Sequence, residues 1–409
     1  MSDMPDADHG NPGVDWTAID PGHRIPELTN VYIYVGDAVR WDFLPGEIAE
    51  RGVVLRTVAA STWSAPSFAS ILTGLSPAGH GVHSFEDRIP TSVTTMYDLP
   101  GTDVRFVNTI QGDTTAPDPI YSIQGRDPPT REFAVVDLQD PFVVVERGPG
   151  GHAPYDGLGR ADTEYFKELN GASTGELYDR YRKMVARDRR QFLDRIRALE
   201  DAGVADDTLV VYTSDHGELL GEHGLIGHNA PMVPELVYVP TVFVHPSLPA
   251  VTVEDTVFRH VDLLPTVQEV LRVESADDRL DGVALSALET GQRGLAITRK
   301  SFAAGTPLEA ELFYEGVWTH DGGQVFPRSG PLARSKILAG KLLASPKRPY
   351  LRRNALTAAR TYLAPSESFG NPPDREAAAS RRPDEYDTAA PSRLAPAERR
   401  TLEDLGYLE

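Results

Sequence analysis

The chain contains no cysteine among its 409 residues, and only six lysines, the first of which is Lys167. Without thiols there are no disulfide bonds, no thiolate metal sites and no cysteine nucleophile. No apolar run approaches the roughly 18 residues that a membrane-spanning helix needs, and the Asp-, Pro- and Gly-rich segment at the start lacks the apolar core of a signal peptide. We therefore expect a soluble cytoplasmic protein without a membrane span.

Positive charge is also scarce. Sixty acidic residues stand against 40 basic ones, which gives a formal net charge of -20 at pH 7. Such a surface repels nucleic acid and anionic membranes, so we expect neither as a partner. It is typical of a chain that stays soluble at high salt, and we interpret it as a solvated, halophilic surface.

The distribution of apolar patterns predicts three parts. Residues 1–25 read as a flexible leader, residues 26–290 as the main domain, and residues 291–409, where the pattern weakens, as a smaller C-terminal subdomain and tail. Buried, non-alternating strands are expected at 30–35 and 208–212, in keeping with a parallel sheet. The fold class is therefore α/β.

Further elements of the main domain follow from spacing. Residues 177–201 predict the clearest helix, because apolar residues recur there at three- and four-residue intervals. A helix is also expected at 67–75, and the stretches 133–138 and 141–145 give a further strand signal. The stretch 91–128 mixes short apolar pieces with Asp, Gly and Pro, so we expect long loops there and assign no chemistry to it.

Residues able to carry chemistry lie where the predicted strands end. Asp37 follows the strand 30–35, and Asp215 with His216 follows the strand 208–212. Ligand sites of open α/β sheets lie beyond the carboxyl ends of the strands. Ser64 precedes Pro66 at a turn that opens a helix, which is also a favourable place for a plain helix cap.

Together these side chains suit the hydrolysis of a sulfate or phosphate ester. Such a reaction needs an in-line nucleophile and neutralisation of charge on the equatorial oxygens. A divalent cation can lower the pKa of a hydroxyl and hold the anion at once. We therefore predict that Asp37, Ser64, Asp215 and His216 are metal ligands, with Ser64 as the nucleophile.

At this point the sequence resembles the sulfatase family of the alkaline phosphatase-like superfamily, over residues 30–285. The matching stretches are NVYIYVGDAVRWD at 30–42, SAPSFASILTGLSPAGHG at 64–81, the helix-strand-SDHGE order of 181–218, GEHGLIGHNAPMVPELVYVP at 221–240 and HVDLLPT at 260–266. The resemblance implies a large mixed, mostly parallel sheet sandwiched by helices, a smaller C-terminal subdomain, one divalent cation and a covalent ester intermediate. Residues 26–290 would then form the catalytic domain.

The resemblance also implies roles for single residues. Asp37, Asp215 and His216 match metal ligands, and Ser64 matches the nucleophile. His152, in a Gly-rich loop, matches a residue that contacts the substrate oxyanion or protonates the leaving group. His228 stands where many members carry a lysine that binds the sulfate group, and we expect it to be catalytic with Ser64 and His152.

This chain departs from the family in three places. Typical sulfatases convert the first residue of a Cys/Ser-x-Pro-x-Arg signature to formylglycine, yet Phe68 stands where the Arg belongs, so we expect Ser64 to stay a plain hydroxyl whose ester water displaces. Ala38 replaces a further oxygen ligand, so the family implies Ca²⁺ while the ligand chemistry suits Mn²⁺ or Zn²⁺. The family's second active-site lysine has no candidate, because none precedes Lys167.

The leading hypothesis is thus a metal-dependent hydrolase of sulfate esters, acting on a small-molecule or glycan ester. A phosphodiesterase, phosphatase or phosphonate monoester hydrolase that uses unmodified Ser64 is the alternative. A transferase of phosphate-bearing head groups and a non-catalytic homologue stay open as well. The sequence identifies neither the substrate nor the oligomeric state.

Overall fold

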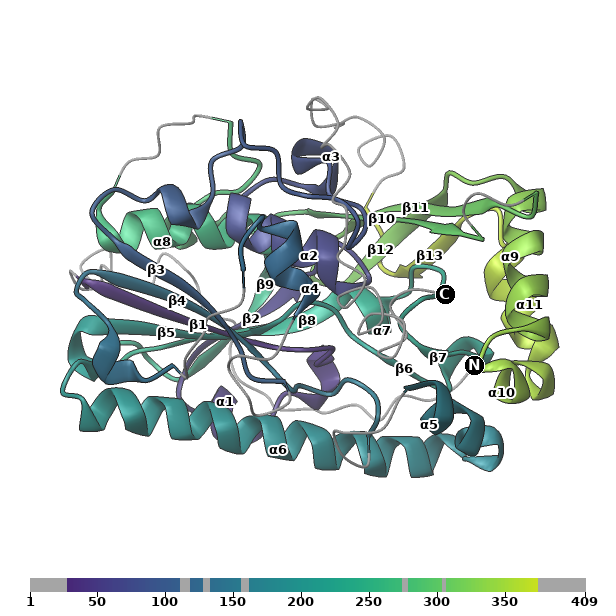
Figure 1. Ribbon diagram of the computed structural model, residues 1–409, viewed down its shortest axis with the longest axis horizontal. Helices are drawn as coiled ribbons and strands as arrows, with labels where there is room; N and C mark the ends of the chain where they lie inside the picture. Colours follow the sequence, from purple (N-terminus) through teal and green to yellow (C-terminus); the bar gives the residue numbers. More distant parts are fainter. Residues whose placement is uncertain are drawn as a thin grey trace.

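A computed structural model describes residues 28–110, 118–127, 133–155, 162–273, 279–303 and 307–373. The predicted leader at 1–25 lies outside these residues. A seven-stranded sheet lies at the centre with helices on both faces (Figure 1). Its order is β3 (Asp103–Asn108), β4 (Phe142–Gly148), β1 (Asn30–Gly36), β5 (Thr208–Ser214), β8 (Tyr238–Val244), β2 (Gly52–Val58) and β9 (Val251–Arg259).

The sheet is mixed and mostly parallel, as predicted. Only β8 runs antiparallel to its neighbours, β5 and β2, and all other pairs are parallel. The strands β1 and β5 pair in register from Asn30 opposite Thr208 to Gly36 opposite Ser214. Both are buried along their whole length, which is why their Val-, Ile- and Tyr-rich sequences do not alternate with polar residues. Their carboxyl ends therefore meet at one edge of the sheet.

Helices cover the two faces of this sheet (Figure 1). One face carries α1 (Gly46–Ala49) and the long α6 (Thr174–Asp201), which begins with a capping box between Ser173 and Glu176. The other face carries α2 (Ser64–Thr73), α3 (Pro77–His80), α4 (Pro119–Ile123) and α8 (Leu263–Leu271). Shorter elements complete this part: α5 (Asp162–Glu168), β6 (Leu219–Leu220), β7 (Ile226–Gly227) and α7 (Pro234–Val237).

The chain then forms a second, antiparallel sheet with three helices beside it. The strands are β10 (Gly294–Phe302), β11 (Ala310–Trp318), β12 (Gly322–Pro327) and β13 (Glu367–Gly370), and the helices are α9 (Pro331–Leu343), α10 (Arg348–Arg353) and α11 (Ala355–Leu363). One buried cluster contains Val58 and Met232 of the main part together with Trp318 of this sheet. The backbone of Ile297 also donates to Ala60 O at 2.8 Å. The two parts therefore share a core. A division of the chain near residue 290 stays a prediction.

Two local predictions are corrected. The strand signal at 141–145 corresponds to β4, whereas residues 133–138 form no strand. A short 3-10 helix occurs there at Val135–Asp137, because β4 already pairs on both sides with β3 and β1. The helix expected at 67–75 begins at Ser64, which puts Pro66 in its first turn, where a missing N–H costs no hydrogen bond.

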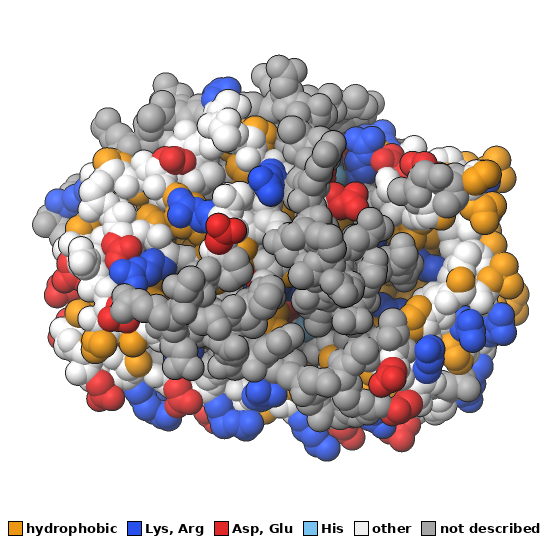
Figure 2. All heavy atoms as spheres, in the orientation of Figure 1, with side chains coloured by type: hydrophobic (Ala, Val, Ile, Leu, Met, Phe, Trp, Pro, Cys, Tyr) orange, Lys and Arg blue, Asp and Glu red, His pale blue; other side chains and the backbone are white. Residues whose placement is uncertain are grey.

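On the face shown in Figure 2, acidic and basic side chains alternate along the lower edge, where Figure 1 places α6. Within the residues that the structure describes, no helix is both long and apolar enough to cross a membrane.

Candidate active site

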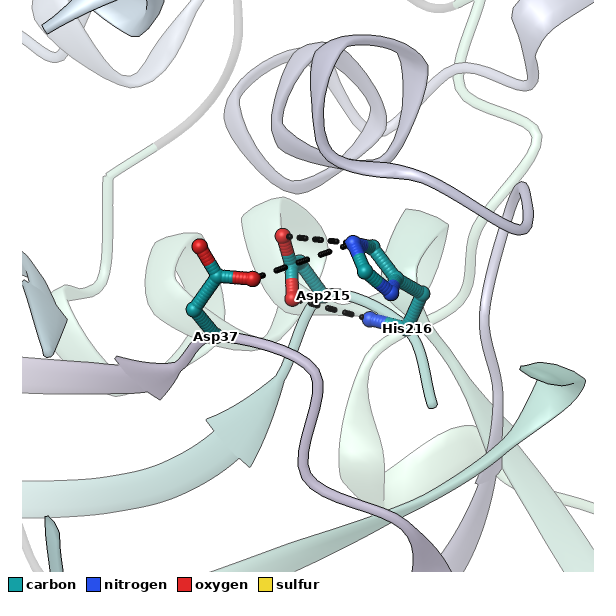
Figure 3. Close-up of side chains that lie close together, drawn as sticks. All are labelled: Asp37, Asp215 and His216. Carbon is teal, nitrogen blue, oxygen red and sulfur yellow. Dashed lines mark hydrogen bonds and ion pairs between the residues drawn. The ribbon is translucent and has the colours of Figure 1, made fainter. Parts of the chain in front are cut away.

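Three ionisable side chains converge beyond the carboxyl ends of β1 and β5 (Figure 3). The Nε2 atom of His216 lies 3.5 Å from Asp215 Oδ2 and 3.8 Å from Asp37 Oδ1. One ligand atom from each residue lies within 4.8 Å of the other two, and all three side chains are fully buried. The adjacent, parallel strands bring residues together that are far apart in the sequence.

The turn after β1 is held from two sides. Its backbone donates hydrogen bonds toward the end of β5, from Ala38 N to Asp215 Oδ1 at 3.0 Å and from Val39 N to Ser214 Oγ at 2.7 Å. From α6, the hydroxyl of Tyr181 donates to Ala38 O at 2.6 Å. These contacts fix the backbone that carries Asp37, while Asp215 keeps its second oxygen facing the cluster.

His216 presents one nitrogen to this cluster. Its Nδ1 lies 2.8 Å from Gly217 O, to which it donates, so Nε2 carries the lone pair. Ser64, the first residue of α2, lies next to this nitrogen, with Oγ 3.2 Å from His216 Nε2. The structure therefore brings together all four side chains that the sequence predicts as metal ligands.

A buried histidine ties the segment before Ser64 to the end of β5. His260 accepts a hydrogen bond from Ala60 N at 3.2 Å through Nδ1 and donates from Nε2 to Ser214 O at 2.9 Å. Burial lowers its pKa to about 4, so the ring is neutral at pH 7, as these two contacts require. The distance between the nucleophile and the metal cluster thus depends on this link.

Sequence analysis missed Arg147, which β4 delivers to the same site. Its guanidinium, with a side chain only 1% exposed, donates to Asp37 Oδ2 at 2.5 Å, to Asp118 Oδ2 at 2.7 Å and to Ser64 Oγ at 3.3 Å. Asp118 lies in the stretch 91–128, to which we assigned no chemistry, and that assignment is corrected. The available signal was a charged residue near the carboxyl end of an otherwise apolar strand.

The two carboxylates of the cluster experience opposite electrostatic effects. Burial alone would raise the pKa of Asp37, but the positive charge of Arg147, with smaller contributions from His152 and His216, brings it below its ordinary value. Burial raises the pKa of Asp215, His216 opposes that rise, and the like charge of Asp37 adds to it. A buried pair of this kind is stabilised by a further cation.

The residues present fit a divalent metal ion. Asp215 Oδ2 is buried and accepts no hydrogen bond from the described residues, although it faces the lone pair of His216. Two carboxylates, one imidazole and one hydroxyl are a mixed N/O donor set, which Mn²⁺ and Zn²⁺ accept readily.

His152 and His228 complete the predicted catalytic set. The rings form a row, with centroids 5.2 Å apart for His152 and His228, and 4.5 Å apart for His228 and His216. Nδ1 of His152 lies 2.5 Å from Ala153 O and donates to it, so its Nε2 is the nitrogen able to exchange a proton. Burial, followed by the neighbouring His216 and His152, lowers the pKa of His228 well below its usual value, so that ring is neutral.

The loop that carries His152 approaches Asp37 through a glycine. Gly150 has a φ of +52°, and a Cβ at this position would come within 1.9 Å of Asp37 O. Any side chain here would both strain the backbone and push the loop away from the metal cluster.

Two lysines of the C-terminal part contact Asn229, which follows His228 in the sequence. Lys300, on β10, donates to Asn229 Oδ1 at 2.9 Å, and Lys341, on α9, donates to Asn229 O at 2.8 Å. The charges of Lys347 and Lys300 also contribute to the lowered pKa of His228. The sequence did not indicate these contacts, because they form only when the C-terminal sheet and helices fold back onto the segment that follows β7.

Comparisons with known proteins point the same way. The sulfatase family profile matches residues 131–273. The low-salt glycan biosynthesis sulfotransferase Agl7 of Haloferax volcanii is 32% identical over 318 residues, which cover 75% of this chain and 76% of that protein.

Two solved structures are similar in fold. A 2-O GAG sulfatase superposes with a TM-score of 0.58 at 15% identity and covers 90% of this chain and 99% of its own. The phosphonate monoester hydrolase of Agrobacterium radiobacter superposes with a TM-score of 0.54 at 16% identity, over 81% of this chain and 96% of its own. At these identities the likeness establishes the shared fold.

Proposed function

Because the chain belongs to the sulfatase family, whose members hydrolyse sulfate or phosphate esters, we propose that it cleaves sulfate esters through a covalent intermediate on Ser64. The observation that carries the proposal is the position of Ser64 Oγ, 3.2 Å from His216 Nε2 and 3.3 Å from Arg147 Nη2. The first distance places the hydroxyl beside the nitrogen that would hold the cation, and Arg147 donates to the oxygen as negative charge develops on it.

The first step exchanges one oxygen on the sulfur for another. Ser64 Oγ bonds to sulfur while the bond from sulfur to the ester oxygen breaks, and the departing oxygen takes a proton from His152 Nε2. Ser64 releases its hydroxyl proton to solvent as its oxygen bonds to sulfur. In the second step water attacks the sulfur, the bond to Ser64 Oγ breaks, and sulfate leaves while Ser64 recovers its proton.

Asp37, Asp215 and His216, with Ser64, would hold the divalent cation. When bound there, such an ion lowers the pKa of the serine hydroxyl and neutralises charge on the sulfate oxygens. The donor set supports Mn²⁺ or Zn²⁺, and the family supports Ca²⁺. Stripping the protein with a chelator and restoring each ion separately tests which of them supports turnover.

Transfer of the sulfuryl group is the second candidate. A relative of 32% identity is named as a sulfotransferase of glycan biosynthesis. The chemistry up to the serine ester is the same, and the two functions differ in whether water or a sugar hydroxyl breaks that ester. Incubation with a sulfate donor, with and without a glycan acceptor, tests this: a sulfated acceptor supports transfer, and free sulfate alone supports hydrolysis.

Sulfur and phosphorus esters are distinguished by a substrate panel. Aryl sulfate, phosphate monoester, phosphodiester and phosphonate monoester are compared with each metal ion. Turnover of the sulfate supports the proposal, whereas diester or phosphonate cleavage without sulfate cleavage would replace it with the phosphorus alternative. If Ser64→Ala keeps every activity of the wild type, the result would support the hypothesis that this site is not catalytic.

A further inference from the structure

Resting on the function proposed above, we infer that Arg147 is a catalytic residue that supplies the fixed positive charge at the nucleophile, in place of an arginine that the helix bearing Ser64 lacks. It would hold the nucleophilic oxygen in line and neutralise charge as the ester on Ser64 forms and breaks. The predicted ligand set includes no residue of β4.

Glu146 and Arg147 are adjacent on β4, and their side chains point to opposite faces of the sheet. Glu146 points to the α6 side of the sheet, where Arg195 donates to its Oε2 at 2.8 Å and Tyr32 donates to the same oxygen at 2.5 Å. Arg147 points to the other side, toward Asp37 and Ser64. The alternation of a β-strand thus separates a structural ion pair from one that contacts the site.

The guanidinium of Arg147 is fixed by two carboxylates. Nη1 donates to Asp118 at 2.7 Å, while Nη2 donates to Asp37 at 2.5 Å and also to Ser64 Oγ at 3.3 Å. A planar guanidinium held at both ends loses little further freedom when it contacts a substrate oxygen. Asp37 meanwhile directs Oδ2 to Arg147 and Oδ1 to His216, so one carboxylate couples the arginine to the metal cluster.

The position of Phe68 gives independent support. In the signature Cys/Ser-x-Pro-x-Arg this position carries the arginine, yet here α2 has no basic residue in its first or last turn and Phe68 is fully buried. The Cζ atom of Arg147 lies 5.5 Å from the centroid of the Phe68 ring, within cation–π distance. A guanidinium is therefore present beside this position, but it comes from the sheet and rests on the ring.

The charge balance explains why a permanent cation is needed there. Asp37, Asp118 and Asp215 are all buried, and an anionic ester on Ser64 would add to their negative charge. Among the described residues, Arg147 is a cation that donates directly to Ser64 Oγ. Hydrogen bonds that involve a charged donor are about twice as strong as neutral ones.

Arg147→Ala with chemical rescue tests the inference. We expect kcat to fall by about 10²–10³ with a smaller change in KM, since the lost donor faces developing charge. Guanidinium at concentrations well below denaturing should restore part of kcat, because it can occupy the vacated space, while urea, similar in shape but uncharged, should not. Equal recovery of kcat by guanidinium and by urea, or a kcat of Arg147→Ala equal to that of wild type, would overturn the inference.

Arg195→Ala is the matched control. It removes the ion pair with the buried carboxylate of Glu146, which precedes Arg147 on β4 and points to the opposite face of the sheet. We expect lower stability with little change in kcat and no guanidinium rescue. If Arg147→Ala does not fold, Arg147→Lys replaces it, because a lysine keeps the charge but cannot bridge Asp118 and Ser64; a kcat equal to wild type in this variant would count against the inference.

Binding of inorganic sulfate by calorimetry separates the inference from the proposed function. We expect Arg147→Ala to bind sulfate at least about tenfold more weakly than wild type, the loss of one charge-assisted hydrogen bond. Equal affinity in both proteins would overturn the role of Arg147 while leaving ester hydrolysis possible. Weakened binding in a protein that turns over no ester would uphold the role of Arg147 and contradict the proposed function.

Discussion

Ser64 Oγ and His216 Nε2 lie 3.2 Å apart, although 152 positions separate them in the chain. The first belongs to the N-terminus of α2 and the second to the loop after β5, so their contact depends on the packing of α2 against the central sheet. The link from Ala60 through His260 to Ser214 holds the same two segments together. The proposed chemistry is therefore a property of the assembled sheet edge.

Ser64→Ala should abolish ester turnover, by about 10³-fold or more, because it removes the hydroxyl that lies beside both His216 and Arg147. The fold should persist, since α2 begins at Ser64 and the Oγ of this residue contacts the side chains of His216 and Arg147. Steady-state kinetics checks this, with Ser67→Ala as the control one turn along the same helix, where Oγ only contacts Ser61 O at 3.4 Å. Equal losses in the two variants would contradict the assignment of the nucleophile.

Asp215→Asn should lose the divalent cation, because it removes a charged ligand from a fully buried cluster. Metal content after dialysis, measured by elemental analysis, and binding calorimetry check this. Asp207→Asn is the matched control, since Asp207 is exposed at the opposite end of β5. Full metal occupancy in Asp215→Asn would show that the ion is bound elsewhere.

His152→Ala should keep the metal ion and lose rate by roughly 10²–10⁴, the usual scale for a group that transfers a proton. The loss should be smaller for substrates with good leaving groups, because these need no protonation. His320→Ala, at a histidine that pairs with Asp321 outside the site, is the control. Loss of metal in His152→Ala, or an equal loss of rate for good and poor leaving groups, would show that the residue has another role.

The buried carboxyl group of Asp188 should make the stability of the protein depend on pH. This residue of α6 accepts hydrogen bonds at 2.8 Å from Tyr34 and Gly150 N through Oδ1, and from Tyr212 through Oδ2. Burial raises its pKa from the ordinary 3.8 to about 6 in spite of these donors. The native state therefore holds the proton more tightly than the unfolded state, and the free energy of unfolding falls as the pH rises from about 4 to about 6.

Asp188→Asn should remove that dependence, because a carboxamide does not titrate. Relative to the variant, wild type should lose on the order of 3 kcal/mol of unfolding free energy across this pH range. Urea denaturation at a series of pH values checks this, with Asp194→Asn, an exposed acid of the same helix, as the control. Parallel curves for wild type and Asp188→Asn would contradict the raised pKa.

Much of the site could be predicted from the sequence because its residues follow apolar runs. Asp37 and Asp215 directly follow strands whose composition marks them as buried neighbours in a parallel sheet, and such strands end at a common edge. Ser64 stands before a proline in the first turn of a helix, a local pattern that the structure contains.

The cationic half of the site could not be predicted in the same way. Asp118 holds the guanidinium of Arg147, and no spacing rule relates these two positions, because their contact depends on how the segment before α4 returns to β4. Lys300 and Lys341 reach Asn229 because β10 is joined to the segment after β2 by the hydrogen bond from Ile297 N to Ala60 O, and α9 packs on the C-terminal sheet. Long-range contacts of this kind have no local pattern in the sequence.

The most direct test of the account is the mass of the peptide that contains Ser64, isolated after rapid acid quench of the enzyme during turnover of an aryl sulfate. We predict an unmodified serine in the resting enzyme and one added sulfuryl group during turnover, absent from Ser64→Ala. Turnover at full rate without any adduct on this peptide, or with the adduct on another residue, would contradict Ser64 as the nucleophile.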